Sequence, residues 1–211
     1  MRGQPVLRDA RIVDESGLHP VVRALWQPRF EEAAVTFEAL VEAGRADGRE
    51  PCWAEMPGSF TLGEVKLTGR ADRIDMLPEG KLGIVDYKTG APPSDAQVKE
   101  GYALQLGLIG LLAECGGFAD VKGTATAFEY WSQGRRSGKP YGYVASPTAG
   151  GRNKIDPEDF IPDIFRHFEA AVETWLTGDA PFTAKLRPEY AYGEFDQLMR
   201  YEEWQGRGGE A

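Results

Sequence analysis

Residues 69–88 read GRADRIDMLPEGKLGIVDYK, and this stretch decides the fold of the chain. It contains two runs with branched apolar residues joined by Pro78-Glu79-Gly80, and a Pro/Gly turn between such runs is typical of a β-hairpin. Positions 72 and 86 are equally distant from Glu79 at the tip. In a symmetric register Asp72 and Asp86 therefore lie opposite each other, with their Cβ atoms roughly 4.5–5.5 Å apart.

Two carboxylates that face each other across a ladder repel and destabilise the sheet, so this hairpin needs either a cation between them or a shifted register. Successive side chains of a strand point to opposite faces. In the symmetric register, one face carries Arg70, Asp72, Ile74, Ile84, Asp86 and Lys88. Two carboxylates and an amine then converge at the open end of the hairpin.

The convergence of Asp72, Asp86 and Lys88 suits Mg²⁺ or Mn²⁺. Such hard cations take oxygen ligands, at roughly 2.0–2.1 Å for Mg²⁺, and the backbone carbonyl of Tyr87 adds a third protein oxygen. The metal would lower the pKa of a bound water and neutralise charge on a phosphate. Lys88 would orient that water or stabilise the transition state. A solvated hairpin surface of mixed charge is the alternative, and the residues alone leave it open.

Outside the hairpin, apolar periodicity predicts helices after Pro28, over 95–115 and over 157–177. Strands are predicted near 52–56, 60–67, 121–131 and 141–145, and a short helical run before Trp204. This order of elements predicts an α/β domain with helices packed on a mixed sheet. We expect an N-terminal extension over 1–27, a core over 28–178 and a tail over 179–211.

The net charge of −9, from 24 basic and 33 acidic residues, argues against a positive coat for non-specific nucleic-acid binding. It does not exclude DNA, because a metal-dependent site needs only a local acidic cluster and local basic groups. Basic loop side chains are available for phosphates: Arg135, Arg136, Lys139, Arg152 and Lys154. Surface loops also carry such charges without any ligand.

Cys52 and Cys115 are far apart in the chain and form no CxxC pair, so we expect buried thiols rather than a zinc or iron–sulfur site. No apolar run approaches the ~18 residues of a membrane span. The N-terminal residues have no apolar segment typical of a signal peptide. These features favour a cytoplasmic location with no membrane partner.

The segments GRADRID and IVDYKTG closely resemble the motifs of the RecB-like branch of the PD-(D/E)xK nucleases. The matching motifs are Gly69-Arg70-Ala71-Asp72 and Asp86-Tyr87-Lys88. The resemblance runs from about Trp26 to Trp204 and is closest to the C-terminal nuclease domain of alphaproteobacterial AddB-type subunits of helicase–nuclease complexes. It includes LWQPRFEEAA, DYKTGAPP, EYWSQG and YGEFDQLMRYEEW.

This resemblance implies a restriction-endonuclease-like core and Mg²⁺- or Mn²⁺-dependent phosphodiester hydrolysis on DNA. The implied substrate is a single-stranded end, digested exonucleolytically during double-strand-break repair beside a helicase partner. Asp72, Asp86 and the Tyr87 carbonyl would bind the metal, Lys88 would assist catalysis, and Gln105 on the following helix would position Lys88 or the phosphate. Glu55 would support the metal site. The residues that would contact DNA are Arg70, Arg135, Arg136 and Lys154.

The chain also departs from the family pattern. The family has a metal-binding histidine on an upstream helix, whereas His19 precedes Pro20 in a turn-like stretch and His167 lies in a late amphipathic helix. A tyrosine often found four residues after the family glutamine is Ile109 here. The cysteines that hold an iron–sulfur cluster in some AddB proteins are absent from the sequence. These departures leave open a non-catalytic module or fragment that keeps the fold for DNA or partner binding.

Overall fold

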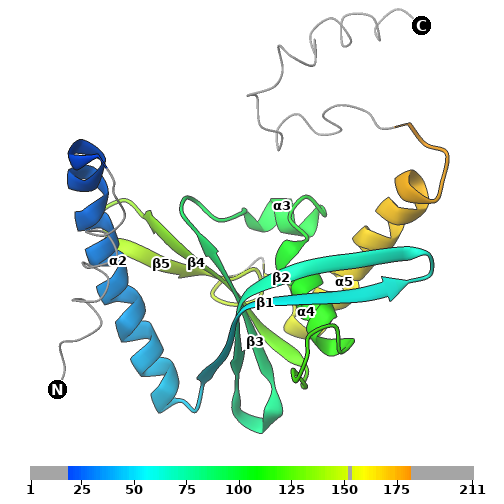
Figure 1. Cartoon of the computed structure of the whole chain (residues 1–211), viewed down its shortest axis with the longest axis horizontal. Coiled ribbons are helices and arrows are strands. Elements are labelled where there is room, and N and C mark those ends of the chain that lie inside the picture. The colour runs from blue at the N-terminus through cyan, green and yellow to red at the C-terminus, as the bar shows by residue number, and fades with distance from the viewer. Residues whose placement is uncertain (1–18, 152–153, 182–211) are drawn as a thin grey trace, which may run out of the picture.

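A five-stranded mixed sheet forms the centre of the computed structural model, which describes residues 19–151 and 154–181 (Figure 1). The strands are β1 (Glu50–Leu62), β2 (Val65–Met76), β3 (Leu82–Lys88), β4 (Ala125–Arg135) and β5 (Tyr141–Ala145), in the spatial order β1-β2-β3-β4-β5. Only β3 and β4 pair in parallel, while the other neighbouring strands are antiparallel. The predicted mixed sheet is confirmed.

The β2–β3 hairpin has the register that its sequence predicts. Ile74 lies opposite Ile84 and Arg73 opposite Val85, so the pairing is symmetric about the tip. A single turn of 3₁₀ helix, η1 (Pro78–Gly80), forms that tip, and Glu79 adopts a left-handed conformation with φ 62°. Asp72 and Asp86 therefore lie one step beyond the last ladder pair, at the open end of the hairpin.

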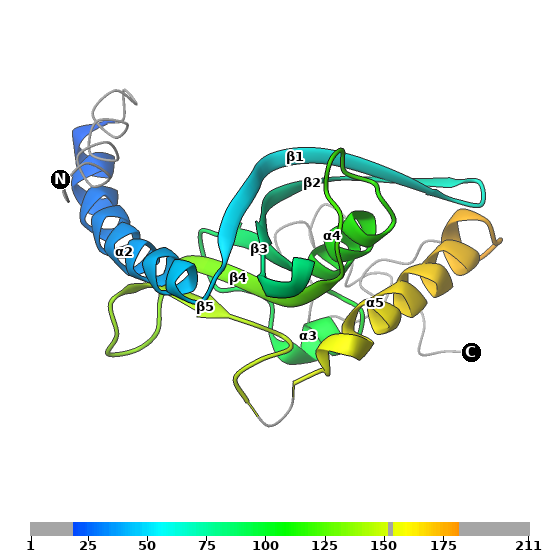
Figure 2. The ribbon, with the colours of Figure 1, turned by 90° about the horizontal axis from the view of Figure 1, so that it is seen from below.

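The β1–β2 hairpin is longer than predicted. The sequence predicts two separate strands near 52–56 and 60–67, but β1 is continuous through Pro57 and Gly58, and a turn separates it from β2. The edge position of β1 explains the difference, since one side of an edge strand makes no ladder hydrogen bonds and tolerates proline. In the view of Figure 2, this long hairpin curves around helix α4.

Helices cover both faces of the sheet. They are α2 (Pro20–Ala46), α3 (Asp95–Lys99), α4 (Gln105–Glu114) and α5 (Pro157–Ala171), and α5 continues into a π-helical segment, η2 (Val172–Leu176). Helices α4 and α5 pack on one face, here called the front, and α2 packs on the opposite face near β5 (Figures 1 and 2). Within the described residues, no helix is long and apolar enough to cross a membrane.

Helix α2 begins before its predicted start and crosses the boundary expected at residue 28. Pro20 occupies its first turn, where a missing N–H is no loss, and His19 caps it by accepting a hydrogen bond from the Val21 amide at 3.3 Å. Pro28, which the prediction treated as the helix start, lies inside the helix. The expected run before Trp204 lies outside the described residues, as does most of the expected tail.

The single helix predicted over 95–115 is instead two helices, α3 and α4. Gly101 interrupts them with φ +81°, and a Cβ at this position would meet His167 Nδ1 at 2.7 Å. His167 of α5 also forms a hydrogen bond through Nε2 with the Lys99 carbonyl at the end of α3. The break lets α4 begin at Gln105, beside the end of β3.

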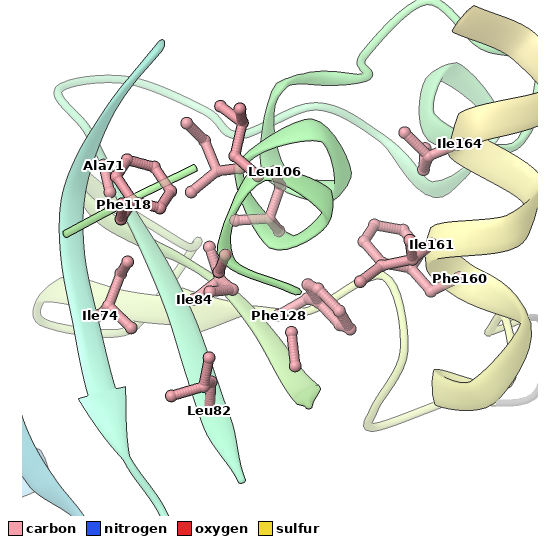
Figure 3. Close-up of a cluster of buried hydrophobic side chains, with 14 of the residues drawn as sticks. Ala71, Ile74, Leu82, Ile84, Leu106, Phe118, Phe128, Phe160, Ile161 and Ile164 are labelled. Atoms are coloured by element: carbon pink, nitrogen blue, oxygen red, sulfur yellow. The ribbon is translucent and has the colours of Figure 1, made fainter. Parts of the chain in front are cut away.

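A single apolar core joins the front face of the sheet to α4 and α5 (Figure 3). Ile74 and Ile84 from the central hairpin are fully buried, as are Leu106 on α4 and Ile164 on α5. Gly107 lets the two helices approach closely, since a Cβ there would lie 2.5 Å from Ile164 Cγ1. The sheet and both helices therefore form one rigid support for the end of β3.

The back face holds a buried network of charges. Asp75 is 0% exposed and accepts two hydrogen bonds from Arg73, each 2.6 Å long, and a third from Arg49. Arg49 also binds both oxygens of Glu129, and the Arg73 guanidinium stacks 4.4 Å from the ring centre of Trp131. Burial alone would lower the pKa of both arginines, but their carboxylate partners raise it. Asp75 and Arg73 therefore form a buried ion pair.

The two cysteines lie on the surface rather than in the core, so the prediction of buried thiols is wrong. Cys52 is exposed on the edge strand β1, and Cys115 is exposed at the C-terminal cap of α4. Neither is in a disulfide bond. Edge strands and helix ends leave side chains in solvent even when the residue type is usually buried.

Replacing Asp75 with alanine is expected to lower the free energy of unfolding by about 3–5 kcal/mol, because it leaves a buried guanidinium without its carboxylate. Urea denaturation followed by circular dichroism measures this change. Asp163→Ala is the control, since Asp163 pairs with Arg166 on the surface and should contribute less than about 1 kcal/mol. Equally small losses for both variants would contradict a stabilising role for the network.

Candidate active site

Asp72 and Asp86 occupy the open end of the β2–β3 hairpin, as predicted. Asp86 is buried, with 6% of its surface exposed, and Asp72 is half-buried. The backbone amide of Tyr87 donates a hydrogen bond of 2.8 Å to Asp72 Oδ2. This bond joins the Asp72 side chain on β2 to the main chain of β3 at Tyr87, which lies between the motif residues Asp86 and Lys88.

Lys88 links the carboxylate of β3 to helix α4. Its Nζ lies 2.7 Å from Asp86 Oδ2 and donates a hydrogen bond of 3.0 Å to Gln105 Oε1. The same ammonium lies 5.7 Å from the ring centre of Tyr130, which pairs with Asp86 in the parallel register of β3 and β4. The i, i+2 spacing puts both charged groups on the front face, and the first residue of α4 reaches the amine.

The electrostatics of the site are set mainly by burial. Burial raises the pKa of Asp86, the Lys88 ammonium opposes that rise, and the negative charge of Asp72 adds to it. Burial also raises the pKa of the Tyr130 phenol, and the charge of Asp86 contributes. The Tyr130 hydroxyl is buried and has no hydrogen-bond partner among the residues that the structure describes. A negative carboxylate at position 86 is therefore held in an environment that favours added positive charge.

The oxygen atoms at this end of the hairpin fit a hard divalent cation. Asp86 Oδ2 is buried, and among the described residues its partner is the Lys88 ammonium, which forms an ion pair with it at 2.7 Å. Asp72 uses Oδ2 for the Tyr87 amide, which leaves Oδ1 for another ligand. In the described part of the chain, no three Asp, Glu, His or Cys side chains gather as a metal site. Two carboxylates, a carbonyl and waters are a ligand set typical of Mg²⁺.

The predicted supporting residue Glu55 lies on β1 and is paired with an arginine. It has a left-handed conformation with φ 52°, between the ladder pairs Ala54–Arg73 and Met56–Ala71, which puts its backbone opposite Asp72. Its side chain forms an exposed ion pair of 3.4 Å with Arg70. This pair is the structural alternative to a metal-supporting role, and it also engages the arginine that was expected to face DNA.

The basic residues predicted to contact DNA lie in different surroundings. Lys154 is mostly buried and binds both oxygens of Asp95 at 2.7 Å, so its charge is already neutralised. Arg135 and Arg136 are exposed and stack on Tyr141 and Tyr143, respectively. Arg152 lies outside the described residues. The structure therefore leaves the two arginines at the end of β4 available for a ligand.

Tyr130 is the site residue that sequence reasoning missed. It comes from β4, which lies next to β3 only because two helices return the chain to a parallel position. The alternation of apolar residues in β4 marks Tyr130 as buried but does not identify its neighbour.

His19 caps α2, and no other histidine except His167 occurs in the chain.

Asp86→Asn is expected to raise the melting temperature in metal-free buffer at pH 7. A folded-state pKa above the unfolded value means that ionised Asp86 destabilises the fold above that pKa, and the amide removes this charge. The difference should disappear as the pH falls below the unfolded value of about 4. Each kcal/mol corresponds to roughly 2–4 °C in a domain of this size. A lower melting temperature for Asp86→Asn at pH 7 would contradict this account.

Two comparisons with known proteins bear on this geometry. A family model described as the PD-(D/E)XK nuclease superfamily matches residues 6–187. An uncharacterized protein of Rickettsia typhi is 28% identical over 88 residues, which make up 40% of this chain and 10% of the relative. The chain therefore aligns with about a tenth of the length of that relative. Because the family model covers most of the chain, including the hairpin with Asp72, Asp86 and Lys88, the protein belongs to the PD-(D/E)XK nuclease superfamily.

Proposed function

We propose that the protein is a Mg²⁺- or Mn²⁺-dependent deoxyribonuclease that hydrolyses phosphodiester bonds. One observation carries this proposal: Asp72, Asp86, Lys88 and Gln105 come together from two strands and a helix at the open end of one hairpin. The buried Asp86 carboxylate lies beside a second carboxylate, Asp72, and has the single ammonium of Lys88 as its ion-pair partner, which supports a further cation at this position. Membership of a nuclease superfamily gives the reaction class.

Each residue has a distinct role in the proposed reaction. Asp72, Asp86 and the Tyr87 carbonyl would hold the metal, which when bound supplies a water of lowered pKa and neutralises phosphate charge. The Lys88 ammonium stabilises negative charge that develops on the phosphate, because it is a fixed cation beside the scissile bond. Gln105 is a positioning residue: it accepts a hydrogen bond from Lys88 and fixes the direction of the amine.

The proposed substrate is the end of a single DNA strand, digested exonucleolytically in double-strand-break repair. This part rests on the resemblance to AddB-type nuclease domains, as do the helicase partner subunit and the cytoplasmic location. Such a partner would also supply positive surface that a chain with a net charge of −9 lacks. The alignment with a tenth of a long relative is consistent with a domain that works beside others.

A second candidate is a catalytically impaired module that uses the fold to bind DNA or a partner. It is favoured by the lack of a third Asp, Glu, His or Cys side chain beside Asp72 and Asp86 within residues 19–151 and 154–181. The two candidates differ in one measurable property. Only the nuclease would cleave DNA, and it would do so only with a divalent cation.

Hydrolysis of labelled single-stranded DNA in Mn²⁺, Mg²⁺ or EDTA tests the proposal. The parent chain should cleave only with metal, and Lys88→Ala should slow cleavage by about 10²–10³-fold, the loss of one electrostatic stabiliser. Asp86→Ala should abolish cleavage. Lys81→Ala is the matched control, because Lys81 pairs with Glu79 at the far end of the same hairpin.

Gln105→Ala adds a test of positioning. It should lower kcat in the parent chain but change little in the Lys88→Ala background, because its effect passes through the amine. Metal-independent cleavage, or equal rates for Lys88→Ala and Lys81→Ala, would contradict the proposed site. A folded parent chain that cleaves no DNA in either metal would favour the non-catalytic module.

A further inference from the structure

A small cavity of about 140 Å³ lies between α2 and the ends of β4 and β5. Its lining includes Trp26, Arg29, Phe30, Thr89, Gln133 and Tyr141. Roughly 150 Å³ is enough to hold a single aromatic ring in another protein. The cavity therefore has the size of one planar ring rather than of a whole nucleotide.

The cavity adjoins the candidate active site at the C-terminal end of β3. Thr89 directly follows Lys88 at the end of β3. Tyr87 and Trp131 pack against Phe37 of α2 on the back face, so alternation within β3 puts Lys88 on the front. Thr89 lines the cavity together with residues of α2. A polymer chain that crosses the end of β3 would contact first the cavity and then the Lys88 ammonium.

Aromatic and cationic groups meet at the cavity. Trp26 and Phe30 are 40% and 37% exposed, and their ring centres are 6.0 Å apart. The Arg29 guanidinium lies 5.5 Å from the Trp26 ring and 5.6 Å from the Tyr141 ring. Exposed rings combined with cations are the features by which proteins stack the bases and bind the backbone of single-stranded nucleic acid.

The charges around the cavity are available to phosphates. Arg135 lies over Tyr141 at 5.2 Å, and Arg136 over Tyr143 at 4.4 Å. Within the parts of the chain that the structure describes, Arg29, Arg135 and Arg136 form no ion pair with a carboxylate. In a chain of net charge −9, three such arginines at one edge form a local positive region.

One residue of the cavity lining carries a polar atom without a partner. Gln133 Oε1 is buried and accepts no hydrogen bond from the described residues. Buried acceptors are normally satisfied, so an unpaired one in a cavity indicates a donor that comes from a ligand. The exocyclic amine of cytosine and the ring N–H of thymine are donors of this kind.

We propose that this cavity binds one pyrimidine base of a single DNA strand that passes over the end of β3 to Lys88. The base stacks against Trp26 or Tyr141, donates a hydrogen bond to Gln133 Oε1, and has its flanking phosphates near Arg29 and Arg135. The inference rests on the proposed function and adds a base-accepting site for the single-stranded substrate.

Fluorescence anisotropy with labelled oligo-dT in EDTA tests the site without hydrolysis. Trp26→Leu should weaken binding by about 5- to 100-fold, the loss of one base stack. Gln133→Leu should also weaken it, and oligo-dA should bind the parent chain less tightly than oligo-dT. Leu25→Ala is the matched control, because Leu25 is 58% exposed on the same helix and does not line the cavity. An oligonucleotide of abasic sites should bind Trp26→Leu and the parent chain equally.

Unchanged oligo-dT affinity in Trp26→Leu and Gln133→Leu would overturn the inference, as would an absence of oligo-dT binding by the parent chain. Tighter binding of oligo-dA would overturn the pyrimidine assignment. The cleavage assay distinguishes failure of this inference from failure of the proposed function. Metal-dependent cleavage with no effect of Trp26→Leu on binding refutes the base site alone, whereas Trp26-dependent binding without cleavage refutes the nuclease and leaves the base site.

Discussion

The antiparallel register of β2 and β3 is the constraint on which the rest of the structure depends. Symmetry about Glu79 brings Asp72 and Asp86 to the same end of the hairpin, where two carboxylates on neighbouring strands would normally destabilise the sheet. The structure reduces this repulsion with a backbone amide on Asp72 and an ammonium in an ion pair with Asp86, but the buried Asp86 Oδ2 accepts no hydrogen bond from the described residues. The negative charge of Asp72 and Asp86 therefore favours binding of a cation at the open end of the hairpin.

The back face of the sheet carries a charge network that stabilises the fold, and the front face carries the candidate active site. On the back face Asp75 is fully paired with two arginines, and this network joins the start of β1 to β2 and β4. On the front face Asp86 is buried without full pairing, and the apolar core beneath it holds α4 so that Gln105 reaches Lys88. Sites that act on a substrate commonly retain such unsatisfied groups, while the surrounding structure compensates for their cost.

Local sequence predicted the features that depend on local chemistry. The hairpin, its register and the shared face of Asp86 and Lys88 are confirmed. The restriction-endonuclease-like α/β fold, which the family resemblance implies, is also confirmed. The position of Tyr130 required the parallel pairing of β3 with β4, which is a long-range contact. The continuity of β1 through Pro57 depended on its place at the sheet edge, and the break at Gly101 depended on packing against His167. None of these leaves a clear pattern in neighbouring residues.

The most direct test of the central claim is Mn²⁺ binding measured by electron paramagnetic resonance, with Asp72→Asn and Asp86→Asn compared to the parent chain. Asp163→Asn serves as a control, because that carboxylate lies on the surface of α5 far along the chain from the hairpin. The account predicts one bound Mn²⁺ in the parent and in Asp163→Asn, and an affinity about tenfold or more weaker in the two hairpin variants. Equal Mn²⁺ affinity in all four proteins, or no binding by the folded parent, would contradict it.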